Sequence, residues 1–206
     1  MEINSFFIKG IKAEYEGNLS YLDKSVYFCF SGPLSDDMRK KARLSLIEAA
    51  ANGYSVVLSG FSKVFYDALE LVLKCRLSVY VVLPEKRSLF SIRGRYRNVL
   101  LSGGAYIFPQ FAENDNGKRK RMCSFFSSSI SSAILFLNYA DYTLASAALD
   151  EGRPIAVMRE SLVRASARSL VYQGCPVVES FSSFLCLPSC YAVALENGRD
   201  FKVYYF

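Results

Sequence analysis

The stretch Gly-Tyr-Ser-Val-Val-Leu-Ser-Gly, residues 53–60, decides the fold of this chain. Its centre is a run of three apolar residues, two of them β-branched, and a glycine stands at each end. Because the apolar residues are consecutive and do not alternate with polar ones, the pattern predicts a strand buried on both faces, as in a parallel sheet. The flanking glycines predict turns that connect this strand to helices.

Runs of the same kind recur along the chain with helical stretches between them. The predicted strands cover residues 26–30, 55–58, 78–83, 133–137, 155–158 and 176–178, and the predicted helices cover 38–52, 65–75, 124–132 and 143–151. Repeated alternation of strand and helix predicts an α/β fold with a right-handed, doubly wound, mostly parallel sheet of the Rossmann-like kind. In such sheets, ligands bind at the carboxyl ends of the strands.

The two ends of the chain depart from this central pattern. Residues 1–24 are predicted to be a short N-terminal extension that contains a strand at 6–8. Residues 25–183 are predicted to be the Rossmann-like domain. Residues 184–206 are predicted to be a C-terminal β-hairpin segment, because Asn197-Gly198 is a strong hairpin signal between two apolar runs.

Composition excludes several kinds of site. The 206 residues contain no histidine, which removes Ser-His-Asp and Cys-His catalysis and histidine metal ligands. The six cysteines include no C-x-x-C pair, and Cys186 with Cys190 alone makes a poor zinc site, so we expect reduced thiols and no metal or cofactor. No segment approaches the roughly 18 apolar residues of a membrane span, and no signal peptide pattern is present, so we expect a cytoplasmic protein.

The net charge of +6 favours anionic partners, and its distribution is more informative than its size. One basic group contains Arg93, Arg95 and Arg97, and a second is the run 118–121. Aromatic residues that could stack on bases lie between or beside these groups. They are Phe90, Tyr96, Tyr106, Phe108 and Phe111, of which we expect one or two at most to have that role. The alternative interpretation is that each basic run is a solvated surface.

Two turns at predicted strand ends are candidates for binding phosphate. Ser59-Gly60 follows a strand and precedes a helix, where backbone amides at the helix N-terminus can receive an anion. The alternative is that Gly60 only permits a tight turn. Ser31-Gly32 is the second such turn, but the following Pro33 lacks an amide donor, which favours a purely structural role there.

The order of four motifs over about residues 15–183 resembles the DprA/SMF family of DNA-processing proteins. Residues 15–19, Tyr-Glu-Gly-Asn-Leu, resemble the Y-x-G-N-L element that leads into the family's first Rossmann strand. Residues 53–62 resemble its second strand and S-G turn, and residues 100–103, Leu-Leu-Ser-Gly, take the place of its L-L-S-E. Residues 145–157, with Leu-Asp-Glu-Gly-Arg-Pro at 149–154, resemble its closing A-L-E-x-G-R element.

The polar signature of that family is largely replaced. The arginine of its G-S-R turn is missing from residues 30–33, and Lys63 stands where the family has an arginine after the second strand. Its R-N-R segment aligns with residues from Cys123 onward, unless a shift of about one helical turn brings in Arg119 and Arg121. A lysine does not reproduce the bidentate contact that a guanidinium makes with phosphate.

The resemblance implies a dimeric, non-enzymatic protein that binds single-stranded DNA and passes it to a RecA-type recombinase in recombination or transformation. The residues we expect to contact DNA phosphates are Ser31, Gly32, Ser59, Gly60, Lys63, Arg93, Arg95, Arg97, Lys118, Arg119, Lys120 and Arg121.

Two other functions stay open on the sequence. The first is a nucleotide-binding or nucleotide-hydrolysing relative of the LOG phosphoribohydrolases, although Asp141, Asp150 and Glu151 lack the glycines of that family's P-G-G-x-G-T-x-x-E element. The second is a degenerate paralogue whose sheet serves as an interaction scaffold and pairs through the C-terminal hairpin.

Overall fold

The computed structural model describes residues 4–30, 32–60, 62–85, 97–112, 116–187, 190–194 and 201–205. The strands are β1 (Asn4–Ile8), β2 (Ile11–Gly17), β3 (Ser25–Phe30), β4 (Ser55–Ser59), β5 (Val79–Val82), β6 (Ala105–Pro109), β7 (Ala133–Leu137), β8 (Ile155–Met158), β9 (Val177–Val178), β10 (Cys190–Ala194) and β11 (Phe201–Tyr205). The helices are α1 (Asp36–Ala51), α2 (Lys63–Lys74), α4 (Asn98–Leu101), α5 (Asn116–Ile130), α6 (Tyr142–Asp150), the 3₁₀ turn η1 (Arg159–Val163), α7 (Ala165–Tyr172) and α8 (Phe181–Leu185).

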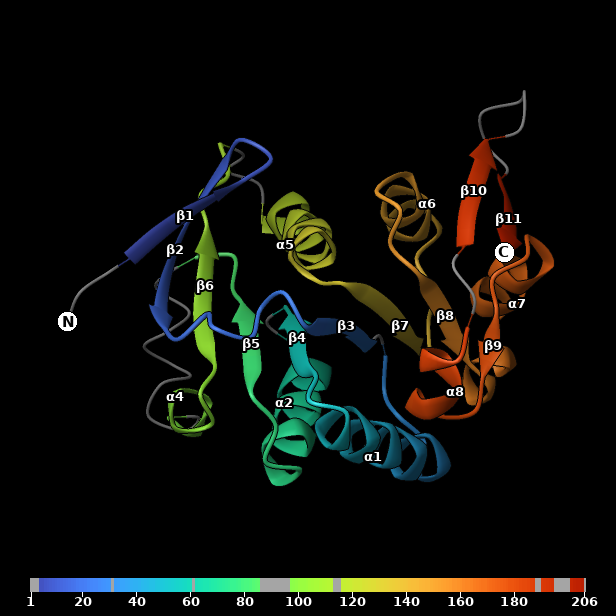
Figure 1. Cartoon of the computed structure of the whole chain (residues 1–206), viewed down its shortest axis with the longest axis horizontal. Helices are drawn as coiled ribbons and strands as arrows, with labels where there is room; N and C mark the ends of the chain where they lie inside the picture. The colour runs from blue at the N-terminus through green and yellow to red at the C-terminus, as the bar shows by residue number, and fades with distance from the viewer. Residues whose placement is uncertain are drawn as a thin grey trace.

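Among the described residues, nine strands form one sheet in the order β1-β2-β6-β5-β4-β3-β7-β8-β9 (Figure 1). The strands from β6 to β9 pair in parallel, and the β1–β2 hairpin adds two antiparallel strands beyond β6. The chain leaves β3 for β4 on one side and returns later to β7 on the other. The direction of winding therefore changes between β3 and β7, which is the topological switch point of the sheet.

Helices cover both faces of the sheet, which explains why its strands are continuously apolar. Val26 and Phe28 of β3 belong to a core shared with α1, α2, α4 and α8. Tyr27 and Cys29 of the same strand belong to a second core shared with α5, α6 and α7. Neighbouring residues of a strand point to opposite faces, so each of these positions has to be apolar or paired.

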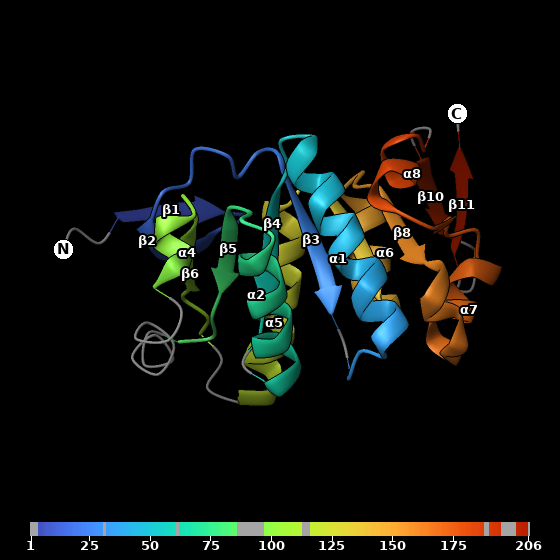
Figure 2. The same cartoon turned by 90° about the horizontal axis from the view of Figure 1, so that it is seen from below.

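The carboxyl ends of the parallel strands share one edge, which we call the strand-end edge. Figure 2 shows the arrowheads of β3 and β5 directed to the edge where α1 and α2 begin. Each helix that starts there is fixed by a local cap. Ser35 accepts from the amide of Met38 at the start of α1, and Ser62 accepts from the amide of Phe65 at the start of α2.

The six predicted strands of the central pattern and the predicted strand at 6–8, which is part of β1, are present, and the doubly wound, mostly parallel sheet is confirmed. Two further strands, β2 and β6, were not predicted. β6 holds Tyr106 and Phe108, which are buried in the core and not available as the base-stacking residues that the sequence suggested. The C-terminal pair β10–β11 is antiparallel, as predicted for a hairpin.

Candidate nucleic-acid interface at the strand-end edge

The turn between β4 and α2 is the first part of the candidate site. Ser59 is the last residue of β4, and Lys63 is the exposed first residue of α2. Gly60 has a φ of +117°, a conformation that side chains rarely adopt, while a Cβ built there would meet only Phe65, at 3.9 Å. Glycine is therefore required here by the backbone conformation and not by crowding.

A polar connection fixes α5 above this turn. The hydroxyl of Tyr27 lies 2.6 Å from Oγ of Ser59, and Oγ of Ser59 lies 3.4 Å from Oγ of Ser124 on α5. Burial raises the pKa of Tyr27 well above its ordinary value, because a phenolate is poorly solvated in the core. Tyr27 therefore stays protonated, and its hydroxyl connects β3 to β4 at Ser59, which in turn contacts α5.

The basic run of α5 extends past the strand ends. Ser124 lies beside Ser59, so a rise of about 1.5 Å per residue places Lys118 about 9 Å further along the helix axis. Lys118, Lys120 and Arg121 are exposed. The basic run is thus the first part of a regular helix that overhangs the strand-end edge.

The contacts of two arginines show how the run is held. Arg119 is partly buried, and its Nη1 lies 3.8 Å from Oε2 of Glu85. Arg121 donates a hydrogen bond of 3.0 Å to Oγ1 of Thr143 at the start of α6, and its guanidinium lies 5.8 Å from the ring centroid of Phe125. Among the described residues, no carboxylate forms an ion pair with Arg121. Its positive charge is therefore exposed at the edge and not neutralised there.

The structure brings together part of the predicted set. Ser59, Gly60 and Lys63 lie at the β4–α2 turn, and the run 118–121 overhangs it from the other face. Arg97 begins α4, which packs beside β5 and β6 on the α1–α2 face. Ser31, Arg93, Arg95, Phe90 and Tyr96 lie outside the described residues.

Gly32 lies beside Asn138 at the switch point between β3 and β7. The Nδ2 of Asn138 donates to the carbonyl of Pro33 at 3.0 Å, and its Oδ1 accepts from Nε of Arg164 at 3.2 Å. A Cβ at Gly32 would lie 3.1 Å from Nδ2 of Asn138. Hydrogen bonds within the protein therefore bridge the point where doubly wound folds bind their ligands.

Neither Asn138 nor Arg164 was singled out from the sequence. Asn138 has a φ of +82°, and its backbone amide donates to Oγ of Ser161 at 2.8 Å. Asparagine is one of the few residues that tolerates a positive φ, so its place directly after the predicted strand 133–137 was the available signal. Its partner Arg164, 26 residues later, carries no comparable local signal.

The helix N-termini at this edge differ in charge. α1 has Asp36 and Asp37 in its first turn, and α6 is capped by Asp141, whose Oδ1 accepts from the amide of Leu144 at 3.2 Å. α2 has no acidic residue in its first turn and carries Lys63 there. Because carboxylates repel phosphate, the start of α2 is the most favourable of these three for an anion.

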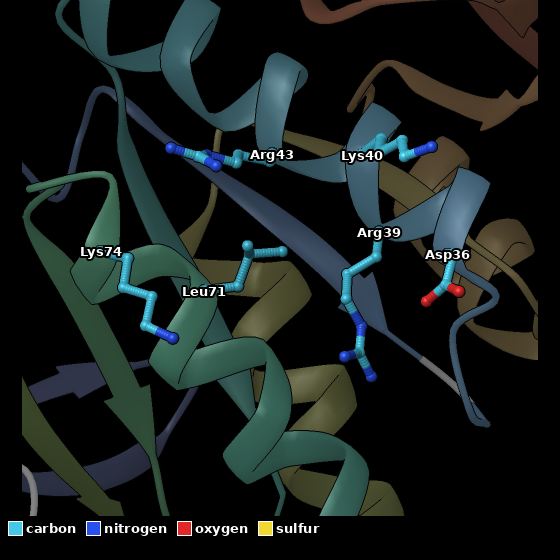
Figure 3. A pocket seen from close by; sticks show the side chains of 6 residues that line it. All are labelled: Asp36, Arg39, Lys40, Arg43, Leu71 and Lys74. Atoms are coloured by element: carbon cyan, nitrogen blue, oxygen red, sulfur yellow. The ribbon is translucent and has the colours of Figure 1, made fainter.

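A second basic surface lies in the open groove between α1 and α2, about 620 Å³ in volume (Figure 3). Arg39 and Arg43 project from α1, and Lys74 projects from α2. Asp36 also lines the groove, and Lys74 is paired with Glu70 at 2.8 Å. These carboxylates partly neutralise the positive charge of the groove.

Two of the thiols, Cys29 and Cys123, are buried in the core. Burial raises the pKa values of Cys29 and Cys123 to about 12, so both stay protonated at neutral pH. No group of three or more Cys, Asp or Glu that could hold a metal ion is found within the described part of the chain. In that part there is likewise no helix long and apolar enough to cross a membrane.

The overall architecture belongs to the Rossmann-like α/β class, and comparison with solved structures narrows it. DNA processing protein A (DprA) from Streptococcus pneumoniae matches with a TM-score of 0.67 and 16% identity, over 84% of this chain and 65% of that one. DNA processing protein A from Helicobacter pylori, described with its single-stranded DNA binding mode, matches with a TM-score of 0.61 and 14% identity, over 84% and 85% of the two chains. The fold of this chain is therefore DprA-like.

A molybdenum cofactor binding protein from Rippkaea orientalis is a more distant structural match. Its TM-score is 0.54 at 13% identity, over 79% of this chain and 93% of that one. No protein-family model matches the sequence, and no curated protein does. At these identities the likeness concerns the fold, and this chain spans about 65% of the length of the pneumococcal protein.

Proposed function

We propose that this protein binds single-stranded DNA along the strand-end edge. The observation that carries the proposal is the position of the basic run 118–121, which overhangs the turn of Ser59 and Gly60, with Lys63 on the opposite face. Such an edge offers cations to a phosphate backbone from two sides. The DprA-like fold supports the choice of ligand, because the H. pylori protein of this fold is described as binding single-stranded DNA.

In this proposal the protein acts without catalysing a reaction. Two of the three carboxylates considered for a nucleotide-hydrolysing relative have other contacts: Asp141 caps α6, and Glu151 is paired with Lys9 and Arg153. The hydrogen bonds of Asn138 to Pro33 and Arg164 at the switch point also argue against a nucleotide bound between β3 and β7. Release of free base from nucleoside monophosphates by the purified protein would overturn this part of the proposal.

The further role we propose is that of the DprA proteins in DNA processing. The protein would act in the cytoplasm as a homodimer and pass bound DNA to a RecA-type recombinase during recombination or transformation. Light scattering of the purified protein tests the dimer. Assembly of a recombinase on a labelled strand, with and without this protein, tests the transfer. A monomer at all concentrations, or assembly that the protein does not change, contradicts the respective step.

The binding itself is tested by fluorescence anisotropy with a labelled oligo-dT. Counterion release makes the logarithm of the affinity fall with the logarithm of salt concentration, by about 0.7 per phosphate neutralised. The double variant Lys120→Gln/Arg121→Gln should bind more weakly, with a slope smaller by about 1.4 if each residue neutralises one phosphate. An affinity for oligo-dT that does not depend on salt contradicts the proposal.

A matched control removes the same charge from the opposite edge of the sheet. Lys24 precedes β3 and Arg76 precedes β5, so Lys24→Gln/Arg76→Gln changes the net charge equally at the amino ends of the strands. We expect this variant to keep the salt slope of the unaltered protein. Equal losses in the two double variants would mean that net charge alone, and not the strand-end edge, attracts the DNA.

A further inference from the structure

A hollow of about 260 Å³ lies between the turn of the β1–β2 hairpin and the outer face of α5. Apolar side chains line most of it. Ile8 and Ile11 come from the hairpin, Phe111 follows β6, and Met122, Phe125 and Phe126 come from α5. Ser129 and Lys9 complete one end, where Lys9 is paired with Glu151.

Both aromatic residues of α5 pack against the core, but only one of them is fully buried by it. Phe126 is 2% exposed and its ring lies 6.2 Å from that of Phe6 of the hairpin. Phe125 packs against the same core at its edge, and part of its surface stays exposed in the hollow. Phe111 is partly exposed there too. Two aromatic rings therefore present surface to the same open space, where a flat apolar group could cover them.

The helix that supplies Phe125 also supplies positive charge on the same face. Lys118, Arg121, Met122 and Phe125 are spaced i, i+3, i+4 and i+7, so they form one stripe along α5. The guanidinium of Arg121 lies 5.8 Å from the ring centroid of Phe125. The stripe thus changes from basic at the strand-end edge to aromatic in the hollow. A nucleotide has the same two parts, a charged phosphate and a flat base.

We propose that this hollow receives one unpaired base of a bound single-stranded nucleic acid, with Phe111 and Phe125 as its stacking surfaces and Arg121 and Lys118 at the adjoining phosphates. The proposal rests on the proposed function and names the site that distinguishes single strands. A base in a duplex is already stacked and paired, and it would have to leave the helix to enter the hollow. The site therefore favours single-stranded over double-stranded DNA.

The test compares Phe125→Leu with a control on two oligonucleotides. Leucine keeps the side chain apolar but removes the ring. Phe7→Leu is the control, because Phe7 is a 69% exposed residue of the same hairpin that does not line the hollow. Affinities are measured by fluorescence anisotropy for oligo-dT and for an oligomer of the same length with abasic sugars, which keeps the phosphates and lacks the bases.

Loss of one base–aromatic contact corresponds to a weakening of about 5- to 150-fold. We expect Phe125→Leu to weaken oligo-dT binding within this range and to leave binding of the abasic oligomer unchanged. Phe7→Leu should change neither. If Phe125→Leu unfolds, Phe111→Leu takes its place with the same expected result.

Failure of the base site and failure of the proposed function give different results. If the unaltered protein binds oligo-dT tightly and both ring-removing variants bind it equally well, the base site is wrong and DNA binding at the strand-end edge stands. If the unaltered protein binds neither oligonucleotide, the proposed function itself fails and the base site with it. Equal weakening of both oligonucleotides by Phe125→Leu also overturns the base site, because the ring would then act only through the position of the basic run.

Discussion

The hydroxyl of Tyr27 and the Oγ of Ser59 lie 2.6 Å apart beneath α5, so a buried side chain of β3 is bonded to the last residue of β4. Phenylalanine at position 27 would keep the apolar packing and remove this hydrogen bond. Loss of one intramolecular hydrogen bond in the core costs about 1 kcal/mol of the free energy of unfolding. We expect Tyr27→Phe to lose about this amount in urea titrations. Tyr172→Phe, at an 88% exposed position, should lose nothing, and equal stability of the two variants would contradict the role of Tyr27.

At position 138, stability should depend on the backbone conformation that the residue allows as well as on its side-chain hydrogen bonds. Both Asn138→Ala and Asn138→Gly remove the side-chain bonds to Pro33 and Arg164. Both replacements must adopt the φ of +82°. Glycine does so without steric cost, whereas a residue with a Cβ loses about 1 kcal/mol of stability. In thermal unfolding we therefore expect both variants to be less stable than the unaltered protein, and the alanine variant to be the less stable of the two. The reverse order would show that backbone strain at this position is unimportant.

The contribution of Glu151 to the free energy of unfolding should depend on pH in the acidic range. Burial alone would raise the pKa of this carboxyl, but the hydrogen bonds and charges of Lys9 and Arg153 outweigh burial and lower it. A lowered pKa in the folded state means that the carboxylate stabilises the fold above its ordinary pKa of 4.5 and loses this effect as the pH falls through the lowered value.

Glu151→Gln should therefore reduce stability at pH 7 and approach the unaltered protein in strongly acidic solution. Urea titrations from pH 7 to pH 3 measure the difference. Asp37→Asn is the control. The side chain of Asp37 is 87% exposed, and its Oδ1 makes only a long contact of 3.9 Å with Nζ of Lys40. A difference for Glu151→Gln that stays constant over this pH range would mean that its carboxylate is not what stabilises the fold.

The cysteines should react in the order of their exposure. Cys186 is exposed, whereas Cys29 and Cys123 are buried with pKa values raised to about 12. Since the thiolate is the reacting form, iodoacetamide at pH 8 should label Cys186 first and leave Cys29 and Cys123 unmodified until the protein unfolds. Peptide mass spectrometry resolves the sites. Early labelling of Cys29 or Cys123 would show that the core around α5 opens readily.

The sequence predicted the parallel sheet because its signal is local and strong. Val56, Val57 and Leu58 are consecutive apolar residues, and in the structure they enter the two opposite cores in turn. β6 was harder to predict, since Tyr106 and Phe108 suit a buried strand and a base-stacking surface equally well. Only the sheet order, which places β6 between β5 and β2, determines that these rings are inside.

The candidate site was less predictable, because it depends on which turns become neighbours. The spacing of Lys118 to Arg121 allowed a flexible loop or a helix, and the contact of Ser124 with Ser59, 65 residues away, is what places the run above the β4–α2 turn. The interaction of Asn138 with Gly32 and Arg164 depends in the same way on strand order. Such contacts between distant segments have no pattern in a single sequence.

If the β4–α2 turn and α5 form one binding surface, Lys63 should contribute to DNA binding while Arg97 should not. Both side chains are exposed on the same face of the sheet, so Lys63→Gln and Arg97→Gln remove equal charge, but only Lys63 begins a helix at the strand-end edge. We expect the salt slope for oligo-dT to fall by about 0.7 in Lys63→Gln and to stay unchanged in Arg97→Gln.

Lys63→Arg extends the same test in the opposite direction. A guanidinium can contact two oxygens of one phosphate, whereas an ammonium acts as a point charge, so arginine at the start of α2 should bind oligo-dT at least as tightly as lysine does. The neutral variant loses affinity on this view and the arginine variant keeps or gains it. If Lys63→Gln and Lys63→Arg both bind like the unaltered protein, the phosphate backbone follows α5 alone and does not cross the β4–α2 turn.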